Sequence, residues 1–139
     1  MAWGSGRGRR GGLTWPARPV RSLLSVDIHE HQDLVHLALE GELDIYTTAS
    51  FRARVRRYDP ARLQLVIDVG AVTMIDSAGL GALLSLRNEA HRGGGRLGLV
   101  CPEGPLAHVF GAAGLRSAFV FGEDLPAVRA ALARAAAPR

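Results

Sequence analysis

The sequence contains no lysine, so all 17 of its basic residues are arginine. A surface selected to bind phosphate groups normally mixes both residue types, and we therefore interpret the bias as codon usage. Residues 1–21 contain five arginines and no acid, whereas residues 22–139 contain 12 arginines and 13 acids, a net charge of −1 (12 − 13). The pI near 10.5 thus belongs to the first 21 residues and does not by itself indicate a nucleic-acid partner.

Cysteine and long apolar runs are also scarce. Cys101 is the only cysteine, which excludes an intrachain disulfide and fits a reducing compartment. No run approaches the ~20 apolar residues that span a bilayer. Glycine, proline and arginine interrupt the N-terminal region where a secretion signal needs an apolar stretch. We therefore expect a cytoplasmic protein without a membrane or direct nucleic-acid partner.

The remaining composition favours one folded domain. The chain has 139 residues, of which 47% are hydrophobic, enough for a core without metals or disulfides. Residues 1–21 combine five glycines and two prolines with the five arginines, so we expect a disordered Arg/Gly-rich N-terminal tail. We expect the domain to comprise residues 22–139.

The hydrophobic pattern predicts an α/β domain with elements in the order β-β-α-β-α-β-α-β-α. Alternating residues indicate two antiparallel strands, a continuous apolar run indicates a buried central strand, and helices alternate with strands thereafter. Such crossovers favour a mixed, mostly parallel sheet of four to five strands with about four helices. The expected elements are strands 25–30 and 33–39, helix 47–58, strand 63–69, helix 77–92, strand 96–100, helix 106–113, strand 118–121 and helix 124–136.

Asp76 and Ser77 lie where a loop after the central strand meets the start of a helix. Both residue types are strong N-caps, because their side-chain oxygens accept the unpaired amide hydrogens of a first helical turn. Gly79 and Gly81 are expected to keep that turn bare, so that a second macromolecule can approach the backbone. A serine at this positive helix end is exposed and favourable for an added phosphate, by roughly 0.3–1 kcal/mol.

Three motifs in this order resemble those of STAS-domain anti-sigma-factor antagonists over about residues 23–135. Ile75-Asp-Ser-Ala-Gly-Leu-Gly81 is similar to the family's Asp-Ser-(Ser/Thr/Ala)-Gly-Leu-Gly motif. Gly41-Glu-Leu-Asp44 resembles its turn after the second strand, and the segment from Pro105 to Leu115 resembles its late helix. Ala78 replaces the second hydroxyl residue that the motif can carry, which leaves one, and Gly70-Ala71 stands where the family often has Leu-Ser. The arginine-rich tail lies outside the family pattern.

The resemblance implies a STAS-type fold and a switchable binding module instead of an enzyme. Ser77 matches the serine that an anti-sigma serine kinase of the GHKL type phosphorylates. The unphosphorylated form would bind that kinase and free a sigma factor, and a metal-dependent serine phosphatase would reset it. No cofactor or bound metal is implied. The implied partner-binding residues are Asp44, Asp76, Ser77, Ala78, Gly79, Leu80 and Gly81.

Three other interpretations compete with this one. Ser77-Ala-Gly79 mimics half of a hydrolase nucleophile elbow, but its first glycine is missing, and His91 or His108 would have to serve as the base. The histidines at positions 29, 31 and 36 could bind zinc, although the ligand count falls short. A STAS module could instead bind a nucleotide or other small ligand, or act as a scaffold in another signalling complex.

Overall fold

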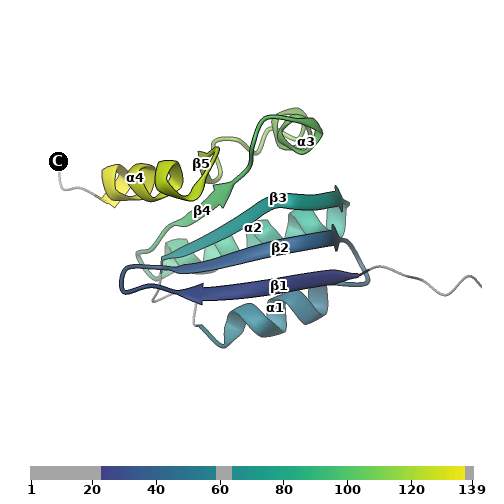
Figure 1. Cartoon of the computed structure of the whole chain (residues 1–139), viewed down its shortest axis with the longest axis horizontal. Helices are drawn as coiled ribbons and strands as arrows, with labels where there is room; N and C mark the ends of the chain where they lie inside the picture. The colour runs from purple at the N-terminus through teal and green to yellow at the C-terminus, as the bar shows by residue number, and fades with distance from the viewer. Residues whose placement is uncertain (1–22, 59–63, 137–139) are drawn as a thin grey trace, which may run out of the picture.

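The computed structural model describes residues 23–58 and 64–136, which form a single α/β domain with the predicted order of elements (Figure 1). The expected disordered tail, residues 1–21, lies outside the described residues. The elements are β1 (Leu24–Glu30), β2 (Val35–Leu43), α1 (Thr48–Arg56), β3 (Leu65–Ile75), α2 (Ser77–Arg92), β4 (Leu97–Val100), α3 (Pro105–Ala112), β5 (Val120–Gly122) and α4 (Leu125–Ala136).

The five strands form one mixed sheet in the order β1-β2-β3-β4-β5. β1 pairs with β2 in an antiparallel register from Leu24–Gly41 to Glu30–Val35, as a hairpin requires. The pairs β2–β3, β3–β4 and β4–β5 are parallel, because a helix intervenes between each pair of strands. The expectation of a mixed, mostly parallel sheet is confirmed.

Helices cover both faces of the sheet, and alternate residues of β3 serve the two sides. Leu65 and Ile67 belong to the main core cluster, which also contains Phe51 of α1, Leu83 of α2 and Phe110 of α3. In Figure 1, α2 passes behind β2 and β3. On the other face, α4 contributes to a smaller cluster with the central strands, comprising Leu34, Val66, Val100, Val128 and Leu132. This two-sided burial explains the continuous apolar run in the sequence.

The prediction that the central strand ends at Val69 and is followed by a crossing loop is wrong. β3 continues to Ile75 and pairs with an extension of β2 that reaches Leu43. The pairing shifts register twice, between Ala38 and Glu40 and again between Gly41 and Glu42 of β2. Each shift places an additional β3 residue in the ladder, the arrangement of a β-bulge, which bends a strand without ending it.

Two side chains replace ladder hydrogen bonds at these irregularities. The Asp68 carboxylate oxygen Oδ1 accepts a hydrogen bond from the Gly70 amide at 2.8 Å. The Thr73 hydroxyl donates to the Gly41 carbonyl oxygen at 3.2 Å. Both contacts are exposed, and each provides a polar partner for a backbone group where the ladder is irregular, which helps to hold the bent half of β3 in the sheet. That half leads directly into α2.

Candidate partner-binding site

The start of α2 has the predicted geometry. Asp76 is the N-cap in extended conformation, and its oxygen Oδ1 accepts a hydrogen bond from the Gly79 amide at 2.9 Å. Ser77 is the first helical residue and is exposed to solvent. An N-cap of this kind stabilises a helix by about 1 kcal/mol. The Ser77 hydroxyl therefore stands on a fixed backbone at the positive end of a 16-residue helix.

Asp76 also connects this helix start to the turn between β2 and α1. Its second oxygen, Oδ2, accepts a hydrogen bond from the Ile45 amide at 3.1 Å, and its own amide donates to the Leu43 carbonyl oxygen at 3.3 Å. These contacts join segments about thirty residues apart in the chain. The turn after β2 and the start of α2 consequently form one continuous surface.

Asp44 stabilises that turn from the inside. Its side chain is buried, with 3% of the residue exposed, and Oδ1 accepts hydrogen bonds from the amides of Tyr46 and Thr47 at 2.9 and 3.1 Å. The Thr47 hydroxyl donates to the Glu42 carbonyl oxygen at 2.8 Å and does not cap α1. Its carboxylate therefore holds the turn in shape, and the role of Asp44 as a partner contact stays a prediction.

The exposed residues of the turn are Ile45 and Tyr46, which the sequence reasoning missed. Each is 66% exposed, and Met74, at the end of β3, is 40% exposed. Exposed apolar side chains that gather in one place mark interaction surfaces more reliably than isolated ones. Two large apolar residues directly after an Asp turn were the available sequence signal. Because Asp76 bonds to the Ile45 amide, this turn adjoins the start of α2, and we call the surface formed by Ile45, Tyr46 and Ser77 the switch face.

The two glycines of the motif have different roles, and one expectation about them is wrong. Gly79 is buried, and a Cβ atom there would lie 2.2 Å from the Leu43 carbonyl oxygen. Its lack of a side chain serves internal packing between α2 and β2, not the approach of a partner. Gly81 is exposed and has no heavy atom within 4 Å of its ideal Cβ position. Of the two motif glycines, only Gly81 leaves open space beside the helix backbone.

The other predicted contact residues are partly covered. Ala78 is half-buried, and Leu80 packs against the main core cluster. The structure thus brings Asp76, Ser77 and Gly81 to one helix start. It turns Asp44 and Gly79 inward, and it adds the apolar side chains of the neighbouring turn.

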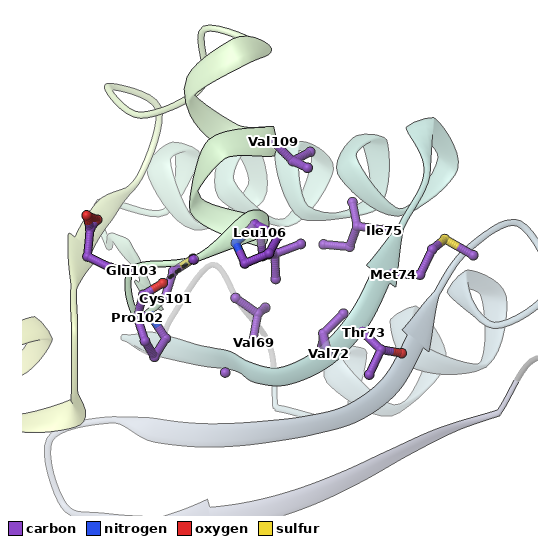
Figure 2. A pocket seen from close by; sticks show the side chains of 13 residues that line it. Val69, Val72, Thr73, Met74, Ile75, Cys101, Pro102, Glu103, Leu106 and Val109 are labelled. Carbon is purple, nitrogen blue, oxygen red and sulfur yellow. Dashed lines mark hydrogen bonds between the residues drawn. The ribbon is translucent and has the colours of Figure 1, made fainter.

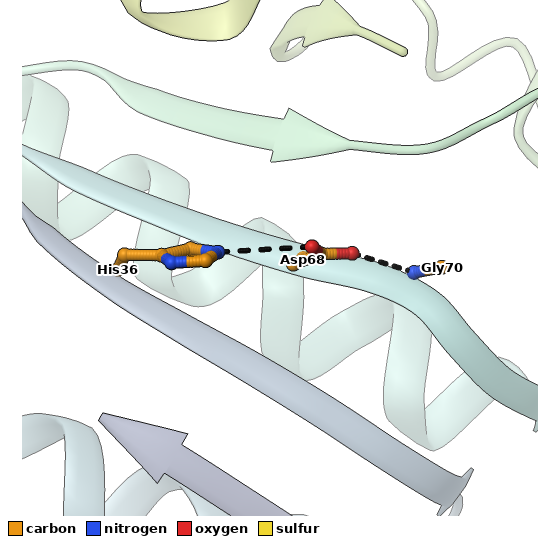
Figure 3. A network of polar contacts seen from close by, with 3 residues as sticks. All are labelled: His36, Asp68 and Gly70. Atoms are coloured by element: carbon orange, nitrogen blue, oxygen red, sulfur yellow. Dashed lines mark hydrogen bonds and ion pairs between the residues drawn. The ribbon is translucent and has the colours of Figure 1, made fainter. Parts of the chain in front are cut away.

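The histidines of the β1–β2 hairpin do not assemble a metal site. The rings of His29 and His36 are stacked with centroids 5.7 Å apart, and His36 Nε2 lies 3.7 Å from Asp68 Oδ2 (Figure 3). Burial lowers the pKa of His36, an effect that the nearby Asp68 carboxylate opposes. Within residues 23–58 and 64–136, no three His, Cys, Asp or Glu side chains are grouped so that they could hold a metal ion.

The histidines proposed as a hydrolase base lie on exposed helix faces. His91 is in the last turn of α2, whereas Ser77 is in its first residue. Fourteen residues of α-helix correspond to about 21 Å. His91 is thus far beyond the hydrogen-bond reach that a general base requires.

In the described part of the chain, no helix is both long enough and apolar enough to cross a membrane.

Comparison with solved structures identifies the same architecture in anti-sigma factor antagonists. An antagonist from Mycobacterium paratuberculosis matches with a TM-score of 0.72 and 20% identity, over 80% of this chain and 95% of that one. SpoIIAA in its unphosphorylated form matches with a TM-score of 0.64 and 21% identity, over 76% and 95%. The phosphorylated form of SpoIIAA, a Bacillus cell fate determinant, matches with a TM-score of 0.59 and 22% identity, over 76% and 98%.

Because these proteins are only 20–22% identical to this chain, the matches show that the fold is shared and nothing more. The family model of the STAS domain matches residues 25–130, which comprise the five strands except Leu24 and the first half of the last helix. This range contains the turn after β2, with Ile45 and Tyr46, and the capped start of α2, with Ser77. The sequence motifs, the strand order and the family model therefore agree, and the chain belongs to the STAS domain family.

Proposed function

We propose that this protein is an anti-sigma factor antagonist, a binding module switched by phosphorylation of Ser77 and not an enzyme. The observation that carries the proposal is the position of Ser77, exposed on a capped helix start in a fold shared with such antagonists. In this proposal the unphosphorylated form binds an anti-sigma serine kinase of the GHKL type and frees a sigma factor. A metal-dependent serine phosphatase restores that form.

The helix start suits a residue that must accept a phosphate without refolding. A phosphoserine carries about −1.5 to −2 charge at neutral pH. The positive end of α2 stabilises such a charge by roughly 0.3–1 kcal/mol. The Asp76 side chain is already committed to the Gly79 and Ile45 amides, so the modification need not displace the cap. We expect the fold of the phosphorylated protein to be unchanged.

The same charge is costly in a desolvated interface. On the switch face, Ser77 lies next to the Asp76 carboxylate and near the exposed side chains of Ile45 and Tyr46. A partner that covers this apolar surface and a neutral hydroxyl would have to bury an unpaired phosphate. A loss of about 4 kcal/mol lowers affinity roughly a thousandfold. Phosphorylation can therefore switch the complex off through local electrostatics alone.

The related structures support phosphorylation as a modification that this fold can carry. SpoIIAA, which shares the fold, is known in both unphosphorylated and phosphorylated forms. In this chain Ala78 leaves Ser77 as the only hydroxyl residue of the motif. We infer that the modified residue is Ser77, that the partners act on transcription, and that the protein works in the cytoplasm.

Copurification followed by phosphopeptide mapping tests this proposal. The protein is isolated from its host, its bound partner is identified by mass spectrometry, and ATP is added to the complex. We expect a GHKL-type serine kinase and phosphate on Ser77. Ser77→Ala should retain the kinase and stay unmodified, whereas Ser117→Ala, which alters an exposed serine in another turn, should behave like wild type. Phosphate on another residue, or a membrane transporter as the copurified partner, would contradict the proposal.

A further inference from the structure

The bent half of β3 and the start of α3 enclose an apolar pocket of about 460 Å³ (Figure 2). Val69, Val72 and Ile75 line it from β3, and Leu106 and Val109 line it from α3. This volume lies within the range of sites that bind small molecules or anchoring side chains. Val109 is 37% exposed, so part of the apolar surface is accessible from solvent.

An acidic hollow of about 350 Å³ adjoins this pocket. Asp68, Glu123 and Asp124 line the hollow, while Gly70 and Pro102 line both it and the apolar pocket. The ideal Cβ position of Gly70 lies 3.5 Å from Pro102 Cδ, so these two residues form a narrow ridge between the two depressions. Gly70 and Pro102 are both exposed, so an extended backbone can reach this ridge.

The rim of this double site is negatively charged. Glu103 lines the apolar pocket and, like Glu123 and Asp124, is exposed. Asp68 is partly engaged, with Oδ1 bonded to the Gly70 amide and Oδ2 lying 3.7 Å from His36 Nε2 (Figure 3). Asp124 Oδ1 accepts a hydrogen bond from the Ala127 amide. An anionic ligand such as a nucleotide would meet like charges here, whereas a cationic group would meet opposite ones.

We propose that this double site docks an extended segment of a protein partner that presents one large apolar side chain flanked by Arg or Lys. The apolar side chain enters the pocket between β3 and α3, and the cation enters the hollow beside Glu123 and Asp124. Apolar burial provides affinity, and charge complementarity fixes the direction in which the segment crosses Gly70. The pocket extends to Met74 and Ile75, just before the start of α2, so it neighbours the switch face. The docking does not require phosphorylation of Ser77.

Titration of the full chain with synthetic peptides, followed by ¹⁵N NMR, tests the proposal. The probe is acetyl-Gly-Arg-Gly-Trp-Gly-Arg-Gly-amide, and two matched peptides replace both arginines with glutamate or the tryptophan with alanine. We expect the probe to shift the amides of Gly70, Val72 and Gly104, and each matched peptide to bind at least tenfold more weakly. Equal binding by the three peptides, or no shift at these amides, would overturn the proposal.

Variants separate the two compartments of the site. Val109→Asp, at an exposed position of the pocket, and Glu123→Arg, in the hollow, should each weaken probe binding at least fivefold. Glu30→Arg, at an exposed position of β1, should leave it unchanged apart from a small effect of net charge. If Glu30→Arg weakens probe binding as much as Glu123→Arg does, the probe responds only to the net charge of the protein. That result would contradict a specific site in the hollow.

Two further measurements distinguish this site from the alternatives. Ser77→Asp should bind the probe like wild type, and loss of binding there would assign the probe to the switch face. Deletion of residues 1–21 should not change probe affinity. The first 21 residues contain Trp15 with Arg10 and Arg18 on either side, the same kind of sequence as the probe. If the probe binds only after the deletion, this segment of the chain is the occupant of the site. That result would exclude a docking site for an external partner.

Discussion

Substitution of Gly79 by alanine should destabilise the fold, although alanine favours helices. Helix propensity alone would stabilise the variant by up to about 1 kcal/mol. The new Cβ, however, would lie 2.2 Å from the Leu43 carbonyl oxygen and 3.1 Å from Leu43 Cγ. The nearest atom belongs to backbone, so α2 and the end of β2 must separate, and overpacking of this kind costs about 1–3 kcal/mol. Because the clash is with backbone, we expect a cost in the upper part of this range, about 2–3 kcal/mol, and hence a net loss of roughly 1–2 kcal/mol.

Gly81→Ala is the matched control, two residues further along the same helix. Its Cβ would have no heavy atom within 4 Å, so only the propensity gain of up to about 1 kcal/mol remains. Urea denaturation of both variants provides the comparison, and the difference corresponds to several degrees in melting temperature for a domain of this size. If Gly79→Ala is as stable as Gly81→Ala, the close packing of α2 on β2 is incorrect.

Three further predictions concern stability and reactivity. Asp76→Ala should lose about 1 kcal/mol of stability in urea denaturation, because the cap on Gly79 disappears, and Asp76→Asn should lose less; equal losses would argue against capping. Burial lowers the pKa of His36 below 6.5, so the unfolded chain binds the proton more readily and stability should fall as pH drops through about 6.5. His36→Gln should remove that part of the pH dependence, and an unchanged profile would refute it. Burial raises the pKa of the Cys101 thiol, so iodoacetamide at neutral pH should modify the native protein much more slowly than the protein in urea, and equal rates would contradict its burial.

The order of elements could be predicted from the sequence because periodicity records which faces are buried. Leu65 and Ile67 face one side of the sheet and Val66 the other, and the apolar run therefore indicated a central strand. The continuation of β3 past Val69 could not be predicted in this way. Gly70 and Thr73 interrupt the alternation, and only the pairing with β2 and the side-chain hydrogen bond from Asp68 show that the ladder continues.

The capped helix start that carries Ser77 could be predicted from the sequence, but much of its surroundings could not. Asp76 and Ser77 carry a local capping signal that needs no tertiary information. The direction of the Asp44 side chain and the crowding at Gly79 depend on contacts with residues far away or across a turn. A motif alone cannot distinguish a glycine required for internal packing from one that leaves a surface open. The exposure of Ile45 and Tyr46 follows from the same inward turn of Asp44.

Calorimetric titration of the copurified kinase tests the central claim most directly. The titrants are the wild-type protein, its phosphorylated form, Ser77→Ala and Ser77→Asp, with Ser117→Asp as the control for an added surface charge. We predict that wild type, Ser77→Ala and Ser117→Asp bind with similar affinity. Ser77→Asp should bind at least tenfold more weakly, a loss of about 1.4 kcal/mol, and the phosphoprotein more weakly still. Equal affinity of Ser77→Ala and Ser77→Asp for the kinase would contradict the account.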